Sequence, residues 1–368
     1  MSKILITGGA GYVGSLLSKQ LEEKGHQIII YDTCWFGSEH ITETSNLKLI
    51  KGDIRDINKF ESSVNGCDIV LHLACISNDP SFALNEDLSK TINFDPFEDL
   101  VKISKAKGVK KFIYASSSSV YGFSDDPNVT EDHPLVPLTL YNKYKGMCEP
   151  ILKDYLDKNF TGIIIRPATV CGYAPHCRLD LSVNILTNHA VNNKKILVLG
   201  GGEQKRPNLH VGDMCRSYEL LVDRDLRDIN GETFNVSYEN KKIIELADIV
   251  AKNVKKFFNY DNIEIEVKKE TVDNRSYHVS SKKIKDVLKR TDHFYTNDYL
   301  STRDDVYADL TFDNVAEIGE ELMRLYQSGE FSKICVVYNQ FVNAATQSVQ
   351  TEQFLPVMAP DAGESSQS

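Results

Sequence analysis

Tyr141 and Lys145 are the two residues in this chain whose types and spacing most directly suggest chemistry. In a helix, residues four apart lie on one face and one turn apart, so the phenol and the ammonium would be neighbours. A free tyrosine has a pKa of about 10 and is a poor base at neutral pH, but a nearby ammonium favours the phenolate. The pair therefore predicts a general base that takes a proton from a hydroxyl group while a hydride leaves the same carbon.

A glycine-rich turn at the start of the chain offers a site for the hydride acceptor. Residues 3–6 predict a strand and residues 15–24 a helix, and Gly8, Gly11 and Gly14 lie between them with the spacing G-x-x-G-x-x-G. Such glycines allow a tight turn and a close approach of the backbone to a pyrophosphate, which the N–H groups of the helix N-terminus can bind. The segment predicts a dinucleotide site.

Acidic residues after the next two predicted strands favour NAD over NADP. Asp32 follows a strand at residues 27–31, where a carboxylate accepts hydrogen bonds from ribose hydroxyls and repels a 2′-phosphate. Asp53 follows the third strand and is expected to hold the adenine. Strands that alternate with helical segments predict a doubly wound parallel sheet. The later strands are expected at residues 47–50, 68–74 and 111–116.

Seven short motifs follow one another in a characteristic order. They are TGGAGYVG at residues 7–14, DIRD at 53–56, HLAC at 72–75, SSSSVYG at 116–122, YNKYK at 141–145, RPATVCG at 166–172 and RPNLHVGD at 206–213. With them, residues from about 3 to 288 resemble the extended short-chain dehydrogenase/reductases, in the NAD-dependent epimerase/dehydratase branch. The resemblance implies a Rossmann-type α/β fold with a smaller substrate-binding subdomain. Members of that family bind NAD tightly and oxidise a hydroxyl, usually at C4, of a nucleotide-linked sugar.

The resemblance also implies roles for individual residues. Ser117, four residues before Tyr121, matches the Ser or Thr that hydrogen-bonds the reacting sugar oxygen, and Lys145 would also hold the nicotinamide ribose. The expected catalytic residues are thus Ser117, Tyr141 and Lys145. The residues expected at NAD are Gly8, Gly11, Tyr12, Val13, Gly14, Asp32, Asp53, Ile54, Leu73, Ala74, Asn93, Tyr141, Lys145 and Pro167. Those expected at the substrate are Ser117, Tyr141, Thr169, Arg178, Asn184, Arg206 and Arg275.

The chain departs from the family pattern in three segments. Relatives that eliminate water across C5–C6 carry an Asp-Glu pair, or at least a Glu, where this chain has Ser118 and Ser119. A serine hydroxyl is too weak an acid or base for that step, so a 4,6-dehydratase is disfavoured. Thr169 replaces an Asn that contacts phosphate in many epimerases, and Cys75 replaces a Gly after the fourth strand. The phosphate contact of that Asn is not carried over.

Several functions stay open within these limits. The stretch at residues 166–181 resembles a subgroup that includes enzymes oxidising the C4 hydroxyl of GDP-linked heptoses. The chain is expected to be an epimerase or oxidoreductase that acts through C4 oxidation. The alternatives are a C4 dehydrogenase that releases the keto-sugar, and a non-catalytic NAD-binding protein. The presence of Ser117, Tyr141 and Lys145 together favours an enzyme, because a scaffold needs none of them.

Composition and charge indicate which partners, metals and cell compartment to expect. The formal net charge of −10 over 368 residues argues against nucleic acid as a partner. No apolar run is long enough for a bilayer, and the start of the chain lacks a signal-peptide pattern. The eight cysteines contain no C-x-x-C pair and are interpreted as reduced thiols, and the nine histidines show no metal spacing. We therefore expect a cytoplasmic, metal-free enzyme with a nucleotide-sugar substrate and, by the resemblance, a homodimer.

The chain is expected to contain three parts and a disordered end. Residues 1–170 with about 206–236 would bind NAD, and about 171–205 with about 237–289 would bind the nucleotide sugar. Residues 290–358 form an atypical appendage, and from about 290 to 357 it resembles an internal segment of the ATP synthase gamma subunit. The matching text is LTFDNVAEIGEELMRLY at 310–326, VYNQFVNAATQ at 337–347 and TEQFLP at 351–356.

The function of this appendage stays open between two accounts. The long terminal helices of the gamma subunit are absent, which argues against ATP synthase subunits as partners. A natural fusion with a docking role and an artefact of fusion or assembly are the alternatives. Pattern and composition predict a helix at residues 315–327, a strand at 333–338 and disorder at 359–368, after a polar, irregular stretch at 290–307.

Deletion of residues 291–368 tests what the appendage does for the fold. The family's usual last helix is missing, so we expect either a less stable protein or a tail segment that packs in its place. If a tail segment packs in, the deletion lowers the melting temperature. An unchanged melting temperature would show that the tail contributes nothing to the fold.

Overall fold

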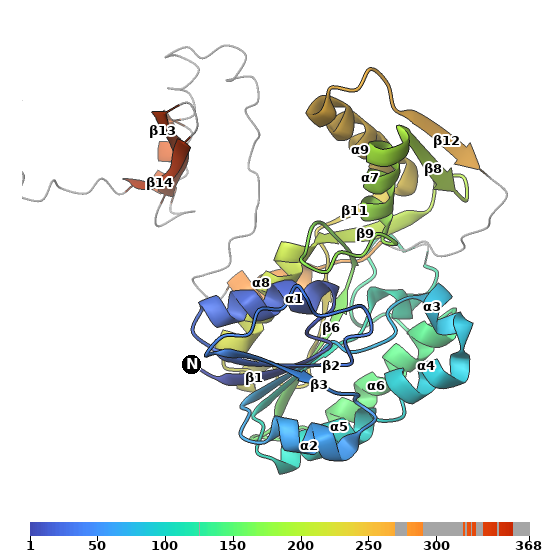
Figure 1. The fold of residues 1–368 in the computed structure, drawn as a ribbon, viewed down its shortest axis with the longest axis vertical. Coiled ribbons are helices and arrows are strands. Elements are labelled where there is room, and N and C mark those ends of the chain that lie inside the picture. The colour runs from blue at the N-terminus through green and yellow to red at the C-terminus, as the bar shows by residue number, and fades with distance from the viewer. Residues whose placement is uncertain are drawn as a thin grey trace, which may run out of the picture. The chain divides into compact units, whose positions relative to one another are not determined.

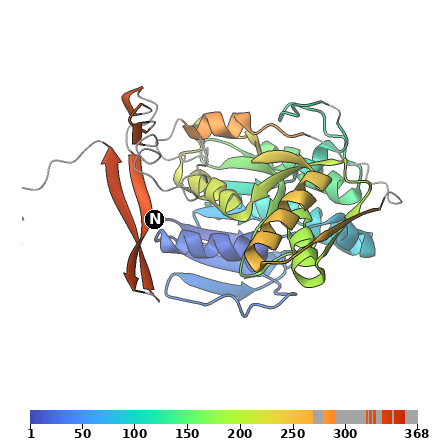
Figure 2. The same ribbon diagram turned by 90° about the horizontal axis from the view of Figure 1, so that it is seen from above.

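The chain is described here by a computed structural model, drawn in Figures 1 and 2. It divides into two compact units, Met1–Phe294 and Tyr295–Ser368, and each is described by itself. The structure describes residues 1–124, 126–268, 278–289, 319–320, 322–324, 326–328, 334–343 and 346–355.

A seven-stranded parallel sheet forms the centre of the first unit (Figure 1). Its order is β10-β6-β5-β4-β1-β2-β3, so the path of the chain reverses between β1 and β4. Ligands of such sheets bind beside the carboxyl ends of the strands at this reversal. The strands are β1 (Lys3–Thr7), β2 (Gln27–Asp32), β3 (Leu47–Lys51), β4 (Ile69–His72), β5 (Lys111–Ala115), β6 (Thr161–Pro167) and β10 (Thr233–Val236).

Helices cover both faces of this sheet, which confirms the predicted Rossmann-type fold. Apolar side chains on the two faces, such as Ile6 and Leu71 on one and Leu5 and Val70 on the other, enter two separate buried clusters. Strands that are buried on both sides read as continuous apolar runs, which is why they were predictable. On one face lie α1 (Tyr12–Glu23) and α8 (Val211–Asp223), and on the other α2 (Ile57–Val64), α5 (Phe97–Ala106) and α6 (Leu140–Tyr155), with α3 (Asp79–Leu84) and α4 (Glu86–Asn93) against α6 (Figure 1).

A smaller α/β subdomain stands beyond the sheet (Figure 1). Strand β8 (Lys195–Leu199) pairs in parallel with β12 (Glu264–Lys268). Helices α7 (Ser182–Asn193) and α9 (Ile243–Phe258) pack on these strands around Leu186, Val198 and Leu246.

A second small sheet, in the order β11-β9-β7, completes the first unit. It contains β9, which falls in the range 206–236 that the sequence assigns to the NAD-binding part. Within that same range, helix α8 packs against α1 and strand β10 pairs with β6 of the main sheet. The remaining elements are β7 (Thr169–Cys171), β9 (Lys205–His210), β11 (Glu239–Lys242), α10 (Lys282–Lys289) and the short helices η1 (Ser118–Tyr121) and η2 (Arg227–Ile229).

The second unit contains an antiparallel hairpin of β13 (Ile334–Asn343) and β14 (Thr346–Leu355). The predicted strand at 333–338 is therefore present but longer, and its partner strand was not predicted. Residues 319–320, 322–324 and 326–327 are helical, within the range of the predicted helix. The irregular stretch and the disordered end that the sequence predicts lie outside the described residues. No helix among the described residues is long and apolar enough to cross a membrane.

Candidate active site

The glycine turn joins β1 to α1 and packs closely against the end of β4. Gly8 has a positive φ of 72°. A methyl group on Gly8 would lie 2.7 Å from the backbone nitrogen of Ala74, and one on Gly14 would lie 2.5 Å from the carbonyl oxygen of Gly8. Only glycine allows the backbone to pack this closely, and the N–H groups of the helix N-terminus beside the turn can bind a pyrophosphate, so this cradle fits a dinucleotide. It also brings the predicted residues Leu73 and Ala74 beside Gly8.

Gly14→Ala is expected to weaken NAD binding by roughly ten- to a hundredfold. The new methyl group would meet backbone atoms of Gly8 and Gly9, which cannot move away as a flexible side chain would. Isothermal titration calorimetry with NAD measures the loss. Gly146→Ala is the matched control, because its methyl group has 3.4 Å to the nearest atom, a side-chain carbon of Leu135. Equal affinities in the two variants would contradict the close packing described for Gly14.

Asp32 ties the glycine turn to the loop that follows β2. Its carboxylate accepts hydrogen bonds from the backbone N–H of Ala10 at 3.0 Å and of Cys34 at 2.9 Å. The carbonyl of Ala10 in turn accepts from His40 Nε2 at 2.8 Å. A carboxylate has further lone pairs, so Asp32 can still accept from a ribose. His40 was not anticipated, because nothing in its sequence neighbourhood marks it.

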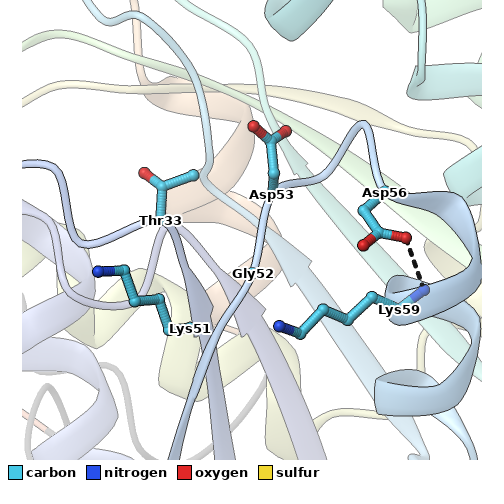
Figure 3. A pocket seen from close by; sticks show the side chains of 6 residues that line it. All are labelled: Thr33, Lys51, Gly52, Asp53, Asp56 and Lys59. Carbon is cyan, nitrogen blue, oxygen red and sulfur yellow. Dashed lines mark hydrogen bonds between the residues drawn. The ribbon is translucent and has the colours of Figure 1, made fainter.

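A pocket of about 290 Å³ opens at the ends of β2 and β3, where the resemblance places the adenine (Figure 3). The Arg55 guanidinium, in a bidentate contact, holds the pKa of Asp53 below its usual range. The Tyr31 hydroxyl donates to the Asp53 carbonyl at 2.8 Å, which fixes the backbone there. Ile54 is buried beside it. The lining residues are Thr33, Lys51, Gly52, Asp53, Asp56 and Lys59.

Two residues that follow Tyr141 hydrogen-bond helix α6 to the end of β5 and to the serine loop after it. Lys145 is buried, and its ammonium donates to the Ala115 carbonyl at 2.7 Å and lies 5.2 Å from the centre of the Tyr114 ring. Asn142 accepts a hydrogen bond from the hydroxyl of Ser119. These contacts bring Ser117, which precedes η1, to the helix that carries Tyr141 and Lys145. The residues expected to be catalytic therefore lie on two segments that hydrogen-bond to each other.

His72 lies directly behind this site but takes no part as an acid or base. Burial, with the Lys145 charge adding to it, lowers the pKa of His72 to about 3. Its Nδ1 is 2.8 Å from the Thr7 hydroxyl. The ring also stacks on Tyr114, with 5.9 Å between centroids. The neutral imidazole therefore joins β4 to β1 through Thr7.

Two of the residues expected at the cofactor make backbone contacts in this structure. The Asn93 amide donates to the Ile76 carbonyl at 2.9 Å and accepts from its N–H at 2.8 Å. It fixes the loop that follows β4. Pro167 ends β6 and pairs with Val236 of β10. Val13, in the first turn of α1, packs against the apolar cluster on that face of the sheet.

The loop after β7 connects the glycine turn to the expected substrate residues. Burial raises the pKa of Tyr12 to about 12, so its hydroxyl stays a donor, and it bonds the Gly172 carbonyl at 2.6 Å. Asn184 accepts from the Gly172 N–H at 2.9 Å and donates to the Arg178 carbonyl at 2.8 Å and to Tyr12. The His176 ring, from the same loop, lies 5.4 Å from that of His40.

The arginines expected at the substrate lie in different surroundings from one another. Arg178 pairs with Asp180 at 2.6 Å, and the Asn78 amide donates to Asp180 at 2.8 Å, which ties this loop to the start of α3. Arg206 is buried on β9, in the same small sheet as Thr169. Arg275 lies outside the described residues.

The sequence model of the NAD dependent epimerase/dehydratase family matches residues 4–237 of this chain. The chain belongs to that family. A second sequence model, ATP synthase, matches residues 246–368 and so begins inside α9, earlier than the predicted start of the gamma-like segment. The family is NAD-dependent, which agrees with the cradle formed by the glycine turn.

Three similar proteins place this member among its relatives. An uncharacterized protein, y4nG of Sinorhizobium fredii, is 35% identical over 57% of this chain, which spans about half (51%) of that protein. A UDP-N-acetyl-alpha-D-glucosaminuronate decarboxylase of Bacillus cytotoxicus is 30% identical over 66% of this chain and 77% of its own length. The solved UDP-N-acetylglucosamine 4-epimerase of Methanobrevibacter ruminantium has the same fold, with a TM-score of 0.69, 22% identity, and coverage of 81% of this chain and 94% of its own.

Proposed function

We propose that this chain is an NAD-dependent nucleotide-sugar epimerase or oxidoreductase that oxidises the C4 hydroxyl of its substrate. The observation that carries the proposal is the hydrogen-bonded junction of α6 with the serine loop, through Ala115 with Lys145 and Ser119 with Asn142. It lies at the carboxyl end of β5, two strands from the glycine turn. The names of two relatives, a UDP-sugar decarboxylase and a UDP-sugar 4-epimerase, support a nucleoside-diphosphate sugar as substrate, and the second names carbon 4.

The catalytic residues beside this junction each have a role in the proposed reaction. Tyr141 takes the proton of the C4 hydroxyl, and Ser117 hydrogen-bonds the same oxygen. The buried Lys145 ammonium stabilises the phenolate and holds the ribose next to the nicotinamide. Bound NAD supplies the hydride acceptor. Arg206 and Arg275 would bind the two phosphates of the substrate, because guanidinium groups pair bidentately with phosphate oxygens. Arg178 lies in the stretch where family members contact the nucleotide diphosphate.

The fate of the 4-keto sugar separates the two forms of the proposal. An epimerase returns the hydride to the other face of the sugar and so restores NAD. A dehydrogenase releases the keto-sugar and needs an external oxidant. We favour the epimerase, because oxidation and return of the hydride need no acid or base beyond those at the site. A dehydratase is disfavoured, since Ser118 is buried and Ser119 is hydrogen-bonded to Ser117.

The proposal extends to the domains that bind each ligand, to the oligomeric state and to the compartment. Residues 1–170 with 206–236 would bind NAD, and residues 171–205 with 237–289 the sugar nucleotide. Family members often dimerise through a four-helix bundle that contains the helix of the catalytic tyrosine, which here would pair α5 and α6 of two copies. The seven free thiols among the described residues are compatible with a reducing cytosol.

Mass spectrometry of products tests the proposal. Purified protein is incubated with a panel of UDP-, dTDP-, GDP- and CDP-linked sugars. A product of unchanged mass and new retention time would establish an epimerase, and loss of two hydrogens a C4 oxidase. Loss of water would contradict the argument from Ser118 and Ser119. No conversion with NAD still bound would favour a non-catalytic NAD-binding protein.

A further inference from the structure

A continuous hydrogen-bonded chain of three side chains leads away from the catalytic serine. The hydroxyl oxygens of Ser117 and Ser119 lie 2.7 Å apart, and the Ser119 hydroxyl donates to Oδ1 of Asn142. Asn142 directly follows Tyr141 and is fully buried. No motif of the sequence gave Asn142 a role, and its side chain is joined to Ser117 through Ser119.

The direction of these hydrogen bonds decides what Ser117 can offer the substrate. Each serine hydroxyl has one hydrogen. When Ser119 gives its hydrogen to Asn142, Ser117 must give its own to Ser119 to keep the contact between them. Ser117 also accepts from the Ser119 N–H at 3.2 Å. In this direction Ser117 presents only a lone pair to the sugar, whereas an oxygen that gains negative charge needs a donor.

The amide of Asn142 can support either direction. Its Nδ2 is buried and has no hydrogen-bond partner among the described residues. An asparagine amide carries an acceptor on one side and two donors on the other, and a buried donor without a partner is costly. A half-turn of the amide brings Nδ2 to Ser119. Asn142 then donates to Ser119, Ser119 donates to Ser117, and the hydrogen of Ser117 is free for the substrate oxygen.

We propose that Asn142 is a positioning residue that sets the direction of the Ser117–Ser119–Asn142 chain, so that Ser117 donates to the sugar oxygen. This inference rests on the proposed function, because the chain ends at the oxygen of the reacting hydroxyl. Asn142 acts through the two serines and does not touch the substrate. The residue that follows the catalytic tyrosine is thereby part of the machinery for oxidation.

Two substitutions of nearly equal shape test this role in the full-length protein. The probe is whichever sugar of the UDP-, dTDP-, GDP- and CDP-linked panel the wild type converts. Asn142→Asp removes the donor, which fixes Ser119 as a donor to position 142, and kcat is expected to fall about a hundredfold. KM and bound NAD should change little. Asn142→Leu removes both functions and no longer sets the direction, but it leaves Ser119 free to donate to Ser117, so its kcat should fall by only about three- to tenfold.

The same substitutions in a Ser119→Ala background show whether the effect on kcat passes through the hydrogen bonds of Ser119. Without the Ser119 hydroxyl the connection is broken, so both substitutions should cost little beyond Ser119→Ala itself. If the carboxylate of Asn142→Asp acted directly on Tyr141, it would lower kcat by the same factor in the Ser119→Ala background, and that result would overturn the proposal. If the aspartate variant does not fold, the leucine variant decides. An unchanged kcat, or an equal loss in both backgrounds, then overturns the proposal.

The outcomes also distinguish this inference from the function on which it rests. A wild type that converts no sugar of the panel overturns the proposed function and this inference with it. A wild type that converts a sugar, with an Asn142→Asp variant as active as the wild type, overturns this inference alone. A hundredfold loss in kcat that disappears in the Ser119→Ala background supports both.

Discussion

Replacing Tyr141 by phenylalanine is expected to lower the rate of sugar oxidation by about two to four orders of magnitude while NAD stays bound. The phenylalanine ring still fits, because Phe82 packs edge-on against the ring of Tyr141, with 6.4 Å between the ring centroids. This contact does not need the hydroxyl. What is lost is the only group that the proposal assigns to remove the C4 proton. Single-turnover absorbance of NADH formation measures the step, and the NAD content of the purified variant shows whether the cofactor site is intact.

Tyr144→Phe is the matched control for that experiment. Tyr144 lies on the same helix, and its ring packs on Phe82 and Phe94 with centroid distances of 5.9 and 5.3 Å. Loss of its hydroxyl is expected to leave the rate within about threefold, because the proposal gives that group no proton to move. Full activity of Tyr141→Phe, or an equal loss in Tyr144→Phe, would remove Tyr141 from the role of base.

The sheet could be predicted because the physics of its strands is local. Five apolar runs in the first 116 residues predicted β1 to β5, and each strand of the structure starts and ends within two residues of the prediction. The largest difference is at β4, which ends at His72. Beyond it, the N–H of Leu73 still donates to the Thr7 carbonyl, but the N–H of Ala74 donates to the Thr7 hydroxyl and no longer to a strand carbonyl.

The hairpin partner in the second unit shows where the same reasoning fails. Strand β14 has the sequence TQSVQTEQFL, which is polar in most positions and lacks the apolar alternation that predicts a strand. Pairing with β13 supplies its backbone hydrogen bonds instead. A strand that depends on its partner in this way is invisible to a pattern that is read along one segment.

The sequence predicted which residues belong to the site but not which groups they hydrogen-bond. The types of Asn93 and Asn184 matched family positions, yet their amides contact the backbone of Ile76, Gly172 and Arg178. The positions of those backbone groups depend on loops that the sequence pattern does not define. Asn142 was missed for the same reason, because its partner Ser119 lies in another element.

A buried ion pair behind the serine loop is the contact that the sequence missed with the largest expected effect on stability. Glu149 on α6 accepts from Arg166 on β6 at 3.0 Å and 2.6 Å and from the Ser116 hydroxyl at 2.6 Å. Arg166 also donates to the Tyr121 hydroxyl at 2.7 Å. The exposed fractions of the Glu149 and Arg166 side chains are only 4% and 6%, so water cannot replace a lost partner.

Glu149→Ala is therefore expected to lower the free energy of unfolding by about 3–5 kcal/mol, because it leaves the Arg166 charge buried without its carboxylate. Glu149→Gln keeps an acceptor for Ser116 and should cost less. The control is Glu98→Ala, which breaks a pair with Lys102 whose side chains are about half exposed and should barely change the midpoint. Urea unfolding measures all three. If Glu149→Ala shifts the midpoint no further than Glu98→Ala, then Ser116 and Tyr121 are held by packing alone, and the serine loop does not depend on this charge pair.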